Sequence, residues 1–315
     1  MIIRPFEYRD YPAVAALTEQ FGKPITAEDL RSRDLSRTHL HWFREVAETA
    51  DGEVAGFCYG MVDKETHPGK FAVNLHVAKP FRRQGLGDRL NDTMERHLRR
   101  EGAIRLYVSV AEQDEDSLNF AEKRGYTRNR LSFESAITPQ TFDATPYEPL
   151  RKKLESEGVS FVPFSEIEDR EQGIHDLFQV NLVAGYDVPG EDEAPWPDVE
   201  SFRRTVVNAP WFRGAGQILA YQDEVPIALG AVGEPKKDHY YNLFTGVLRE
   251  HRGRGLATAL KVLGIQFAKN AGAETLLTHN DSRNAPMIAI NQKLGYQNRP
   301  GWYRMEKTAN KGEFI

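Results

Sequence analysis

The sequence predicts an α+β protein made of two tandem domains, on the evidence of its length, an internal repeat and the order of its elements. At 315 residues the chain exceeds one typical domain, and two domains of about 150 residues could each bury a core. A glycine-bearing segment at 81–102 returns at 251–272, and the pair Gly125-Tyr126 returns as Gly295-Tyr296. Both offsets are 170 residues, which indicates two copies of one fold.

Apolar and turn patterns place the elements of the first half. Asp10 can cap a helix that carries Val14, Leu17 and Phe21, and Asp51-Gly52 marks a hairpin between two strands. The 81–102 segment supplies a glycine turn and then a helix with apolar residues at helical spacing. The predicted strands are 1–5, 42–48, 54–62, 71–77, 104–110 and 126–137, and two further helices are predicted at 26–33 and 117–123.

A proline-bearing stretch from 138 separates the halves, and a short charged helix at 150–157 closes it. The order of elements then restarts. The predicted second-half strands are 159–163, 216–221, 225–232 and 243–248, and the predicted helices are 167–184 and 199–207, followed by the helix of 251–272 and a strand and helix within 278–296. We therefore predict an N-terminal domain at 1–145, a linker at 146–158 and a C-terminal domain at 159–315.

The segment 251–272 carries the strongest chemical signal in the chain. Here a strand runs into a turn with Gly253 and Gly255, and the turn opens a helix with an apolar stripe that includes Leu256 and Leu260. Glycines carry no Cβ, so the backbone can approach a ligand closely and point successive amides at it. The amides and the positive dipole end of the helix favour an anion, which predicts a diphosphate site.

The two turns resemble a known signature. Residues 82–87, here called the first glycine loop, read Arg-Arg-Gln-Gly-Leu-Gly, and residues 252–257, the second glycine loop, read Arg-Gly-Arg-Gly-Leu-Ala. They are similar to the Arg/Gln-x-x-Gly-x-Gly/Ala signature of the GCN5-related N-acetyltransferase (GNAT) superfamily. That resemblance implies two GNAT-like domains, each with a mixed, mainly antiparallel twisted sheet flanked by helices, and acetyl-CoA as co-substrate.

The resemblance also implies which residues hold the coenzyme. In the second half these are Val247, Arg252, Gly253, Arg254, Gly255, Leu256, Ala257, Thr258, Asn280 and Asn284, and in the first half Val77, Arg82, Arg83, Gln84, Gly85, Leu86 and Gly87. Asn280 and Asn284 have an alternative role in helix capping. Because Thr258 can donate to a phosphate whereas its counterpart Asp88 would repel one, we expect the second loop to be the working site and the first to be weakened.

The sequence does not assign the catalytic acid and base. Many members of the superfamily carry a tyrosine acid four residues before the Gly-aromatic pair, but Asn291 and Ala121 stand there and neither can serve. Tyr240, Tyr241 or Tyr303 could replace that acid. His76 is a candidate base, although a lone histidine on a strand also packs as an ordinary side chain.

Composition limits the partners. A net charge of −5 gives no general affinity for nucleic acid, and no apolar run is long enough for a membrane helix. Cys58 is the single cysteine, so no disulfide forms within the chain. His251 and His279 show no metal-ligand spacing with other histidine, cysteine or carboxylate groups, so no metal is predicted. With no signal segment at the start, we expect a cytoplasmic monomer or homodimer.

The sequence therefore predicts a transferase of the N-acyltransferase class that moves an acetyl group from acetyl-CoA to a primary amine of a small molecule. The acidic run at 191–200 could attract such a cationic acceptor. Two alternatives stay open: a non-enzymatic protein that binds or senses acyl-CoA, and an acetyltransferase that acts on a protein or peptide amine.

Overall fold

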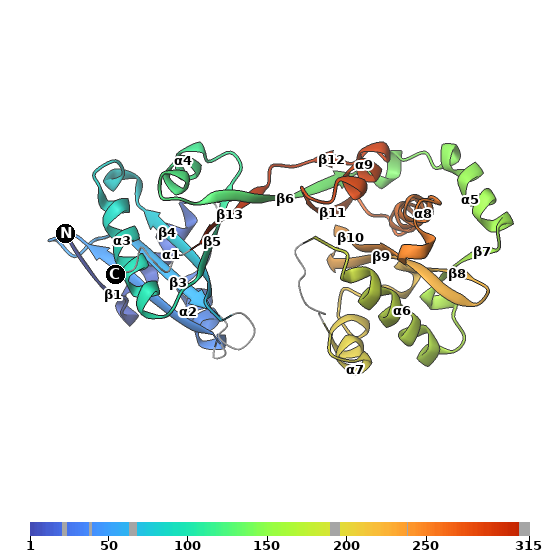
Figure 1. The fold of residues 1–315 in the computed structure, drawn as a ribbon, viewed down its shortest axis with the longest axis horizontal. Coiled ribbons are helices and arrows are strands. Elements are labelled where there is room, and N and C mark those ends of the chain that lie inside the picture. Colours follow the sequence, from blue (N-terminus) through green and yellow to red (C-terminus); the bar gives the residue numbers. More distant parts are fainter. Residues whose placement is uncertain (21–23, 38–39, 63–67, 190–195, 238, 309–315) are drawn as a thin grey trace. The chain divides into compact units, whose positions relative to one another are not determined.

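The computed structural model describes residues 1–20, 24–37, 40–62, 68–189, 196–237 and 239–308. The chain divides into two compact units (Figure 1). Unit 1 comprises Met1–Asn129 with Trp302–Ile315, and unit 2 comprises Arg130–Gly301. Each unit is a mixed sheet with helices on both faces, so the predicted α+β class is confirmed.

Unit 1 holds its strands in the order β1-β2-β3-β4-β5-β13, and within that order only β4 and β5 are parallel. These strands are β1 Ile2–Pro5, β2 His41–Glu48, β3 Val54–Val62, β4 Lys70–Val77, β5 Arg105–Ala111 and β13 Trp302–Thr308. The helices are α1 Tyr11–Glu19, α2 Ala27–Ser36, α3 Leu86–Arg100 and α4 Glu115–Lys123. The expected Phe21 lies outside the described residues.

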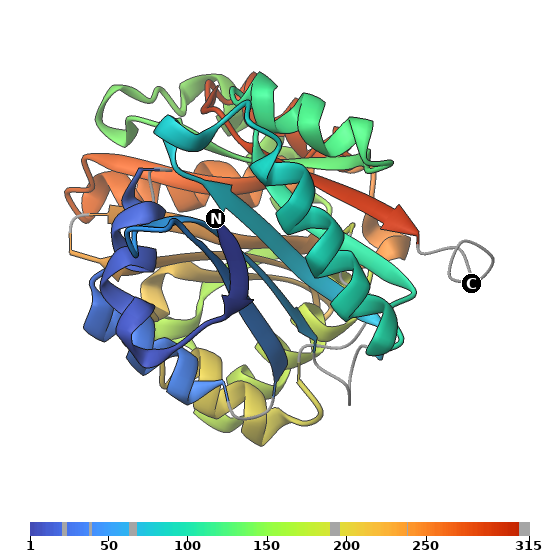
Figure 2. The same ribbon diagram turned by 90° about the vertical axis from the view of Figure 1, so that its left-hand side faces the viewer.

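The helices of unit 1 are held by apolar stripes that the sequence already shows. Leu90, Met94 and Leu98 of α3 are buried against β3 and β4, and Figure 2 shows α3 running along that face of the sheet. On the other face, Val14 of α1 and Leu30 of α2 pack against β2 and β3. Each such burial stabilises the fold by about 1.5–3 kcal/mol.

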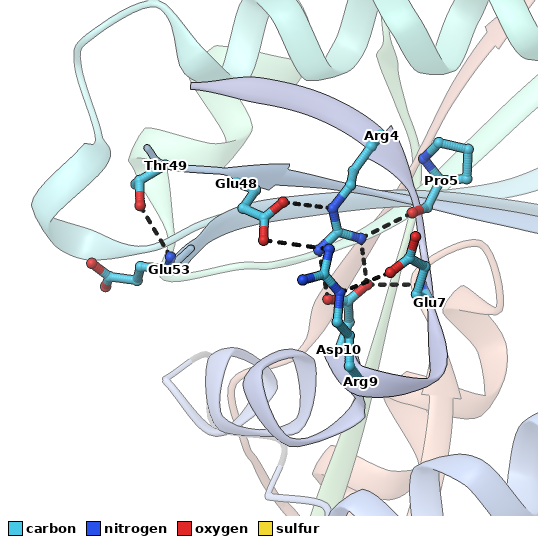
Figure 3. A network of polar contacts seen from close by, with 8 residues as sticks. All are labelled: Arg4, Pro5, Glu7, Arg9, Asp10, Glu48, Thr49 and Glu53. Carbon is cyan, nitrogen blue, oxygen red and sulfur yellow. Dashed lines mark hydrogen bonds and ion pairs between the residues drawn. The ribbon is translucent and has the colours of Figure 1, made fainter. Parts of the chain in front are cut away.

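A network of charged side chains joins β1 to its neighbours (Figure 3). The Arg4 guanidinium donates to both carboxylate oxygens of Asp10 at 2.8 Å and to Glu48 Oε2 on β2 at 2.7 Å. The Glu7 amide also donates to Asp10 at 2.7 Å. Strand β7 of the second repeat ends on a proline as β1 does, but carries Val162 where β1 carries Arg4, so this network belongs to the first repeat alone.

Unit 2 holds its strands in the order β6-β11-β10-β9-β8-β7, and β12 also pairs with β6. These strands are β6 Thr127–Ile137, β7 Val159–Pro163, β8 Gln217–Gln222, β9 Val225–Lys236, β10 His239–Val247, β11 Thr275–Asp281 and β12 Gln297–Asn298. The helices are α5 Glu148–Ser156, α6 Arg170–Gly185, α7 Val199–Phe202, α8 Leu256–Asn270 and α9 Ala285–Lys293. The predicted helix at 199–207 is α only over its first turn, and a π-helical turn continues it over Arg203–Val207.

The two repeats exchange their last strands: the last strand of the first repeat pairs in unit 2, and the last strand of the second repeat pairs in unit 1. Strand β6 begins in unit 1 and then pairs antiparallel with β11 of the second repeat, from Ile137 opposite Leu276 to Ser132 opposite Asp281. Strand β13, at the end of the second repeat, pairs with β5 of the first. The compact units therefore differ from the ranges 1–145 and 159–315 that the repeat indicates, because the closing strands of the two repeats, β6 and β13, have changed places.

The linker region forms part of unit 2. The charged helix predicted at 150–157 is α5, and its Leu154 is fully buried against Val159 and Leu256. Within the described ranges, no helix is both long and apolar enough to cross a membrane.

Candidate acyl-CoA site

The two glycine loops have the same backbone form. In each, a strand ends, a 3-10 turn follows, and a glycine in the left-handed region precedes the helix: Gly85 has φ +78° before α3, and Gly255 has φ +95° before α8. Neither glycine supplies a side-chain cap, so the first amides of α3 and α8 have no partner within their own helix. Each loop therefore offers uncapped donors and a dipole end to an anion.

Both loops are fastened to the preceding strand by their first arginine. Arg82 Nε donates to the Val77 carbonyl at 2.9 Å, and Arg252 Nε donates to the Val247 carbonyl at the same distance. Arg252 also donates to Asp187 at 2.5 Å, and Arg249 pairs with that carboxylate too. The pKa of Asp187 is well below its usual range because the two arginines donate to it. Arg252 thus holds the loop in shape.

The other side chains of the loops also bind protein groups. Arg254 donates to Gln222 at 2.8 Å and to Glu157 at 3.1 Å. In the first loop, Arg83 donates to Asp116 at 2.5 Å and Gln84 to the Pro80 carbonyl at 2.9 Å. Because these side chains are paired with protein groups, the uncapped main-chain amides at the helix starts are the candidate donors to a ligand.

The surroundings of the two N-cap glycines differ. A Cβ at Gly85 would meet nothing within 4 Å, whereas a Cβ at Gly255 would lie 2.8 Å from Leu150 Cδ1 of α5. Gly253 of the second loop has open space around it and φ +78°; its counterpart Arg83 takes the same left-handed region at φ +60°. Gly255 is thus required by its backbone angle and by its packing.

The first turns of the two helices carry different charges. Asp88 on α3 pairs with Arg124, whose guanidinium lies 4.0 Å from the Phe120 ring centroid. The matching positions in the second repeat are Thr258 and Leu294, neither of which is charged. The carboxylate one residue beyond the first glycine loop thus has a cationic partner, Arg124, at the end of α4.

The strands that lead to the loops stop pairing before they end. Parallel β4 and β5 pair only as far as Ala72 opposite Tyr107, and β10 and β11 only as far as Asn242 opposite Thr278. Five residues of each leading strand remain beyond that point, up to Val77 in β4 and Val247 in β10. Backbone groups along these stretches have no pairing partner on the parallel neighbour.

A buried lysine, which the sequence analysis did not single out, lies beside Asn242, where the pairing of β10 with β11 ends. Lys261 of α8 is 2% exposed, donates to the Asn242 side chain, and lies 5.4 Å from the Tyr296 ring centroid. Burial lowers the pKa of Lys261 to about 7. Asn242 in turn donates to the carbonyls of Ala231 and Phe244, where the pairing of β10 with β9 shifts register. The signal in the sequence was a lysine inside an apolar helical stripe.

The candidate catalytic residues are divided between the two units. His76 is buried on β4 with its ring 4.7 Å from that of Phe57. Tyr240 is buried in unit 2 near Phe267. Tyr303 lies in unit 1, opposite Val110 of β5, because the strand exchange carries it there. His76 and Tyr303 thus belong to unit 1 and Tyr240 to unit 2.

Asparagines shape the second repeat beyond the loop. Asn284 accepts from the Met287 amide as the N-cap of α9. Asn280 is buried, donates to Ser135 at 2.8 Å, and accepts from Asn291 at 2.7 Å. Asn291, at the position of the expected tyrosine acid, is 1% exposed. In this structure the three amide side chains bind protein groups.

Two predictions concern groups around the site. Among the described residues, no three histidine, cysteine or carboxylate side chains gather to hold a metal ion. Residues 191–195 of the acidic run, including Asp192 and Glu193, lie outside the described residues.

Comparison with known proteins gives a consistent result. The model of the acetyltransferase (GNAT) family matches residues 9–126 and 183–296. A mycothiol acetyltransferase of Pseudarthrobacter chlorophenolicus is 24% identical over 89% of this chain and 83% of its own length, and one of Thermobifida fusca is 25% identical over 92% and 88%. A GCN5-related N-acetyltransferase of Sphaerobacter thermophilus superposes with a TM-score of 0.63 at 19% identity, over 98% of this chain and 95% of that one. A tandem GNAT protein from the clavulanic acid biosynthesis pathway gives 0.61 at 19% identity, over 98% of each chain.

Proposed function

Because the chain belongs to the acetyltransferase (GNAT) family and is an acetyl-CoA-dependent N-acetyltransferase, we propose that its acceptor is a primary amine of a small molecule. The relatives named mycothiol acetyltransferase match this chain over most of both lengths. Their name couples acetyl transfer to mycothiol, a small molecule. That full-length similarity is the observation that carries the proposal.

We place the working acyl-CoA site at the second glycine loop. Its helix begins with uncapped amides and carries the hydroxyl of Thr258 where the first helix carries the carboxylate of Asp88. A hydroxyl can donate to a phosphate oxygen, whereas a carboxylate repels it even when an arginine is near. In this proposal, amides from Gly253 to Thr258 bind the diphosphate and the unpaired stretch of β10 holds the pantetheine arm.

The family chemistry requires an amine that has lost its proton and a thiolate that can leave. The amine nitrogen attacks the thioester carbonyl carbon, a C–N bond forms, and the C–S bond breaks with its electron pair on sulfur. Because Asn291 is buried and bound to Asn280, we infer that the leaving thiolate takes its proton from water and not from a side chain at that position.

The experiment is the release of free thiol from acetyl-CoA in the presence of small primary amines or of peptides with free N-termini. The proposal expects thiol release that depends on a small amine and not on the peptides. Release with peptides alone would assign a protein or peptide acceptor instead.

A further inference from the structure

Four polar side chains gather on unit 2 outside the glycine loop, and we call them the Glu134 cluster: Glu134, Tyr241, His279 and Arg299. Tyr241 on β10 donates its hydroxyl to Glu134 Oε1 on β6 at 3.1 Å. His279 of β11 is the direct cross-strand neighbour of Glu134. A guanidinium nitrogen of Arg299 lies 3.8 Å from Glu134 Oε2, which is too long for a hydrogen bond.

The cluster lies next to the point where the parallel strands part. Tyr241 immediately precedes Asn242, the last residue of β10 that pairs with β11. Asn242 faces α8, where it meets Lys261, and successive side chains of a strand point to opposite faces. Tyr241 therefore faces away from the helix that follows the glycine loop. An acyl group held along β10 would lie between the loop and this cluster.

Solvent reaches these groups. The Glu134 side chain is 37% exposed. His279 is exposed as well, and so is Leu243, which lies two residues after Tyr241 on β10. The Tyr241 hydroxyl stays protonated, because burial and the neighbouring Glu134 carboxylate both raise its pKa. It donates to Oε1, while Oε2 forms an ion pair at 3.8 Å with the Arg299 guanidinium, a partner that an acceptor ammonium would share.

The exchanged strand is what completes the cluster. Glu134 belongs to β6, which by sequence closes the first repeat, whereas Tyr241 and His279 belong to the second. In the part of the chain that the structure describes, the other candidate base, His76, is buried on β4 of unit 1. A carboxylate is thus supplied to the second repeat by the strand that enters it from the first.

We propose that Glu134 binds the acceptor ammonium and takes its proton at the second glycine loop, with Tyr241 as the positioning residue that orients the carboxylate. This inference rests on the proposed small-amine acceptor. The ammonium gives one proton to Glu134, the nitrogen lone pair attacks the thioester carbon, and the C–S bond breaks. As the C–N bond forms, the nitrogen passes its second proton to a water molecule, the thiolate takes a proton from that water, and Glu134 returns its proton to solvent.

The test compares Glu134→Gln with wild-type protein, using acetyl-CoA and ethanolamine, glucosamine or spermidine as probes. The amine that gives the fastest wild-type thiol release is kept. At pH 7 we expect kcat/KM for that amine to fall about 100-fold, the usual contribution of a general base. The loss should shrink to roughly tenfold or less at pH 9.5, because more of the amine is then already deprotonated. The KM for acetyl-CoA should not change, since Glu134 is not part of the loop.

Two further variants give the control and the positioning readout. Glu274→Gln makes the same chemical change at an exposed glutamate just before β11 and should leave all constants unchanged. Tyr241→Phe should lower kcat by about tenfold with the KM for acetyl-CoA intact.

The outcomes separate the two proposals. An active wild type with an equally active Glu134→Gln, or with the same loss at every pH, overturns the role of Glu134 and leaves the small-amine acceptor standing. A wild type that releases no thiol with any of the three amines, while it still binds acetyl-CoA, overturns both.

Discussion

The two glycine loops share a backbone and differ in the side chains one turn beyond it. Gly85 and Gly255 take the same left-handed conformation, and both loops are fastened by an arginine that binds the carbonyl of the strand before them. The side chains that follow are unlike: Asp88 corresponds to Thr258, and Asn91 to Lys261. The backbone of the loop is therefore repeated while the charge next to it is changed.

The largest expected difference between the halves concerns Lys261 and its counterpart Asn91. Since burial lowers the pKa of Lys261 to about 7, the unfolded chain holds a proton that the folded chain lacks between pH 7 and about 10.4. Stability from this group therefore rises with pH across that window. The wild type should gain on the order of several kcal/mol relative to Lys261→Met between pH 7 and pH 9.5.

Thermal unfolding of both proteins at each pH measures this gain. Asn91→Met, the matched change in the first repeat, carries no titrating group and should show no such trend against wild type. Parallel pH curves for wild type and Lys261→Met would contradict a buried amine that is neutral in the folded state.

The second difference tests which loop binds the coenzyme. Thr258→Asp places a carboxylate at the start of α8, where Leu294 stands in place of the arginine that pairs with Asp88. An unpaired carboxylate beside a diphosphate should weaken acetyl-CoA binding by about 100-fold or more. The exchange Asp88→Thr should leave the main binding event unchanged. Calorimetric titration of both variants decides the matter, and an unaltered dissociation constant for Thr258→Asp would move the working site to the first loop.

The sequence predicted the loops because their signals are local. Glycines that need a positive φ and apolar residues at helical spacing act within about 20 residues, so α3 and α8 and the turns before them were expected where they are found. The predicted charged helix before β7 is also present as α5.

The strand exchange could not be predicted in this way. Strands β6 and β13 are both strand-like segments that follow a Gly-Tyr pair, and either fits beside β5 or β11 by local pattern. Tyr303 therefore appears in unit 1, and Glu134 appears beside Tyr241, for reasons that lie in long-range pairing. The contact of Leu150 with Gly255 is equally non-local in its effect, since it joins a linker helix to a loop about 100 residues away.

A third difference is the ion-pair network that only the first repeat carries. Burial alone would raise the pKa of Asp10, but hydrogen bonds from Arg4 and the Glu7 amide outweigh it and lower the pKa. The stabilisation is therefore present above the unfolded value of about 3.9 and is lost as pH falls through the folded value. Asp10→Asn should cost about 2 kcal/mol at pH 7.

Denaturant unfolding at pH 7 and at pH 2.5 checks both parts of this expectation. The gap between wild type and Asp10→Asn should narrow at the lower pH, because the unfolded wild-type carboxyl is then protonated and the wild type has to release that proton to form the ion pair. Asp51→Asn, at an exposed hairpin residue of the same unit, is the control and should cost nothing measurable. A gap that keeps its size at pH 2.5 would mean that the carboxylate charge is not the source.

The smallest difference lies at the two N-cap glycines and separates backbone strain from packing. Alanine at Gly85 meets no neighbour, so Gly85→Ala should cost about 1 kcal/mol from its positive φ alone. Gly255→Ala has the same strain and also meets Leu150 at 2.8 Å, so it should cost roughly 1 kcal/mol more. In a Leu150→Ala background that excess should disappear, because the side chain that the new methyl meets is gone. Urea unfolding of wild type, Gly255→Ala, Leu150→Ala and the double variant closes a double-mutant cycle. An excess cost that persists without the Leu150 side chain would show that the second loop is strained by its backbone and not by α5.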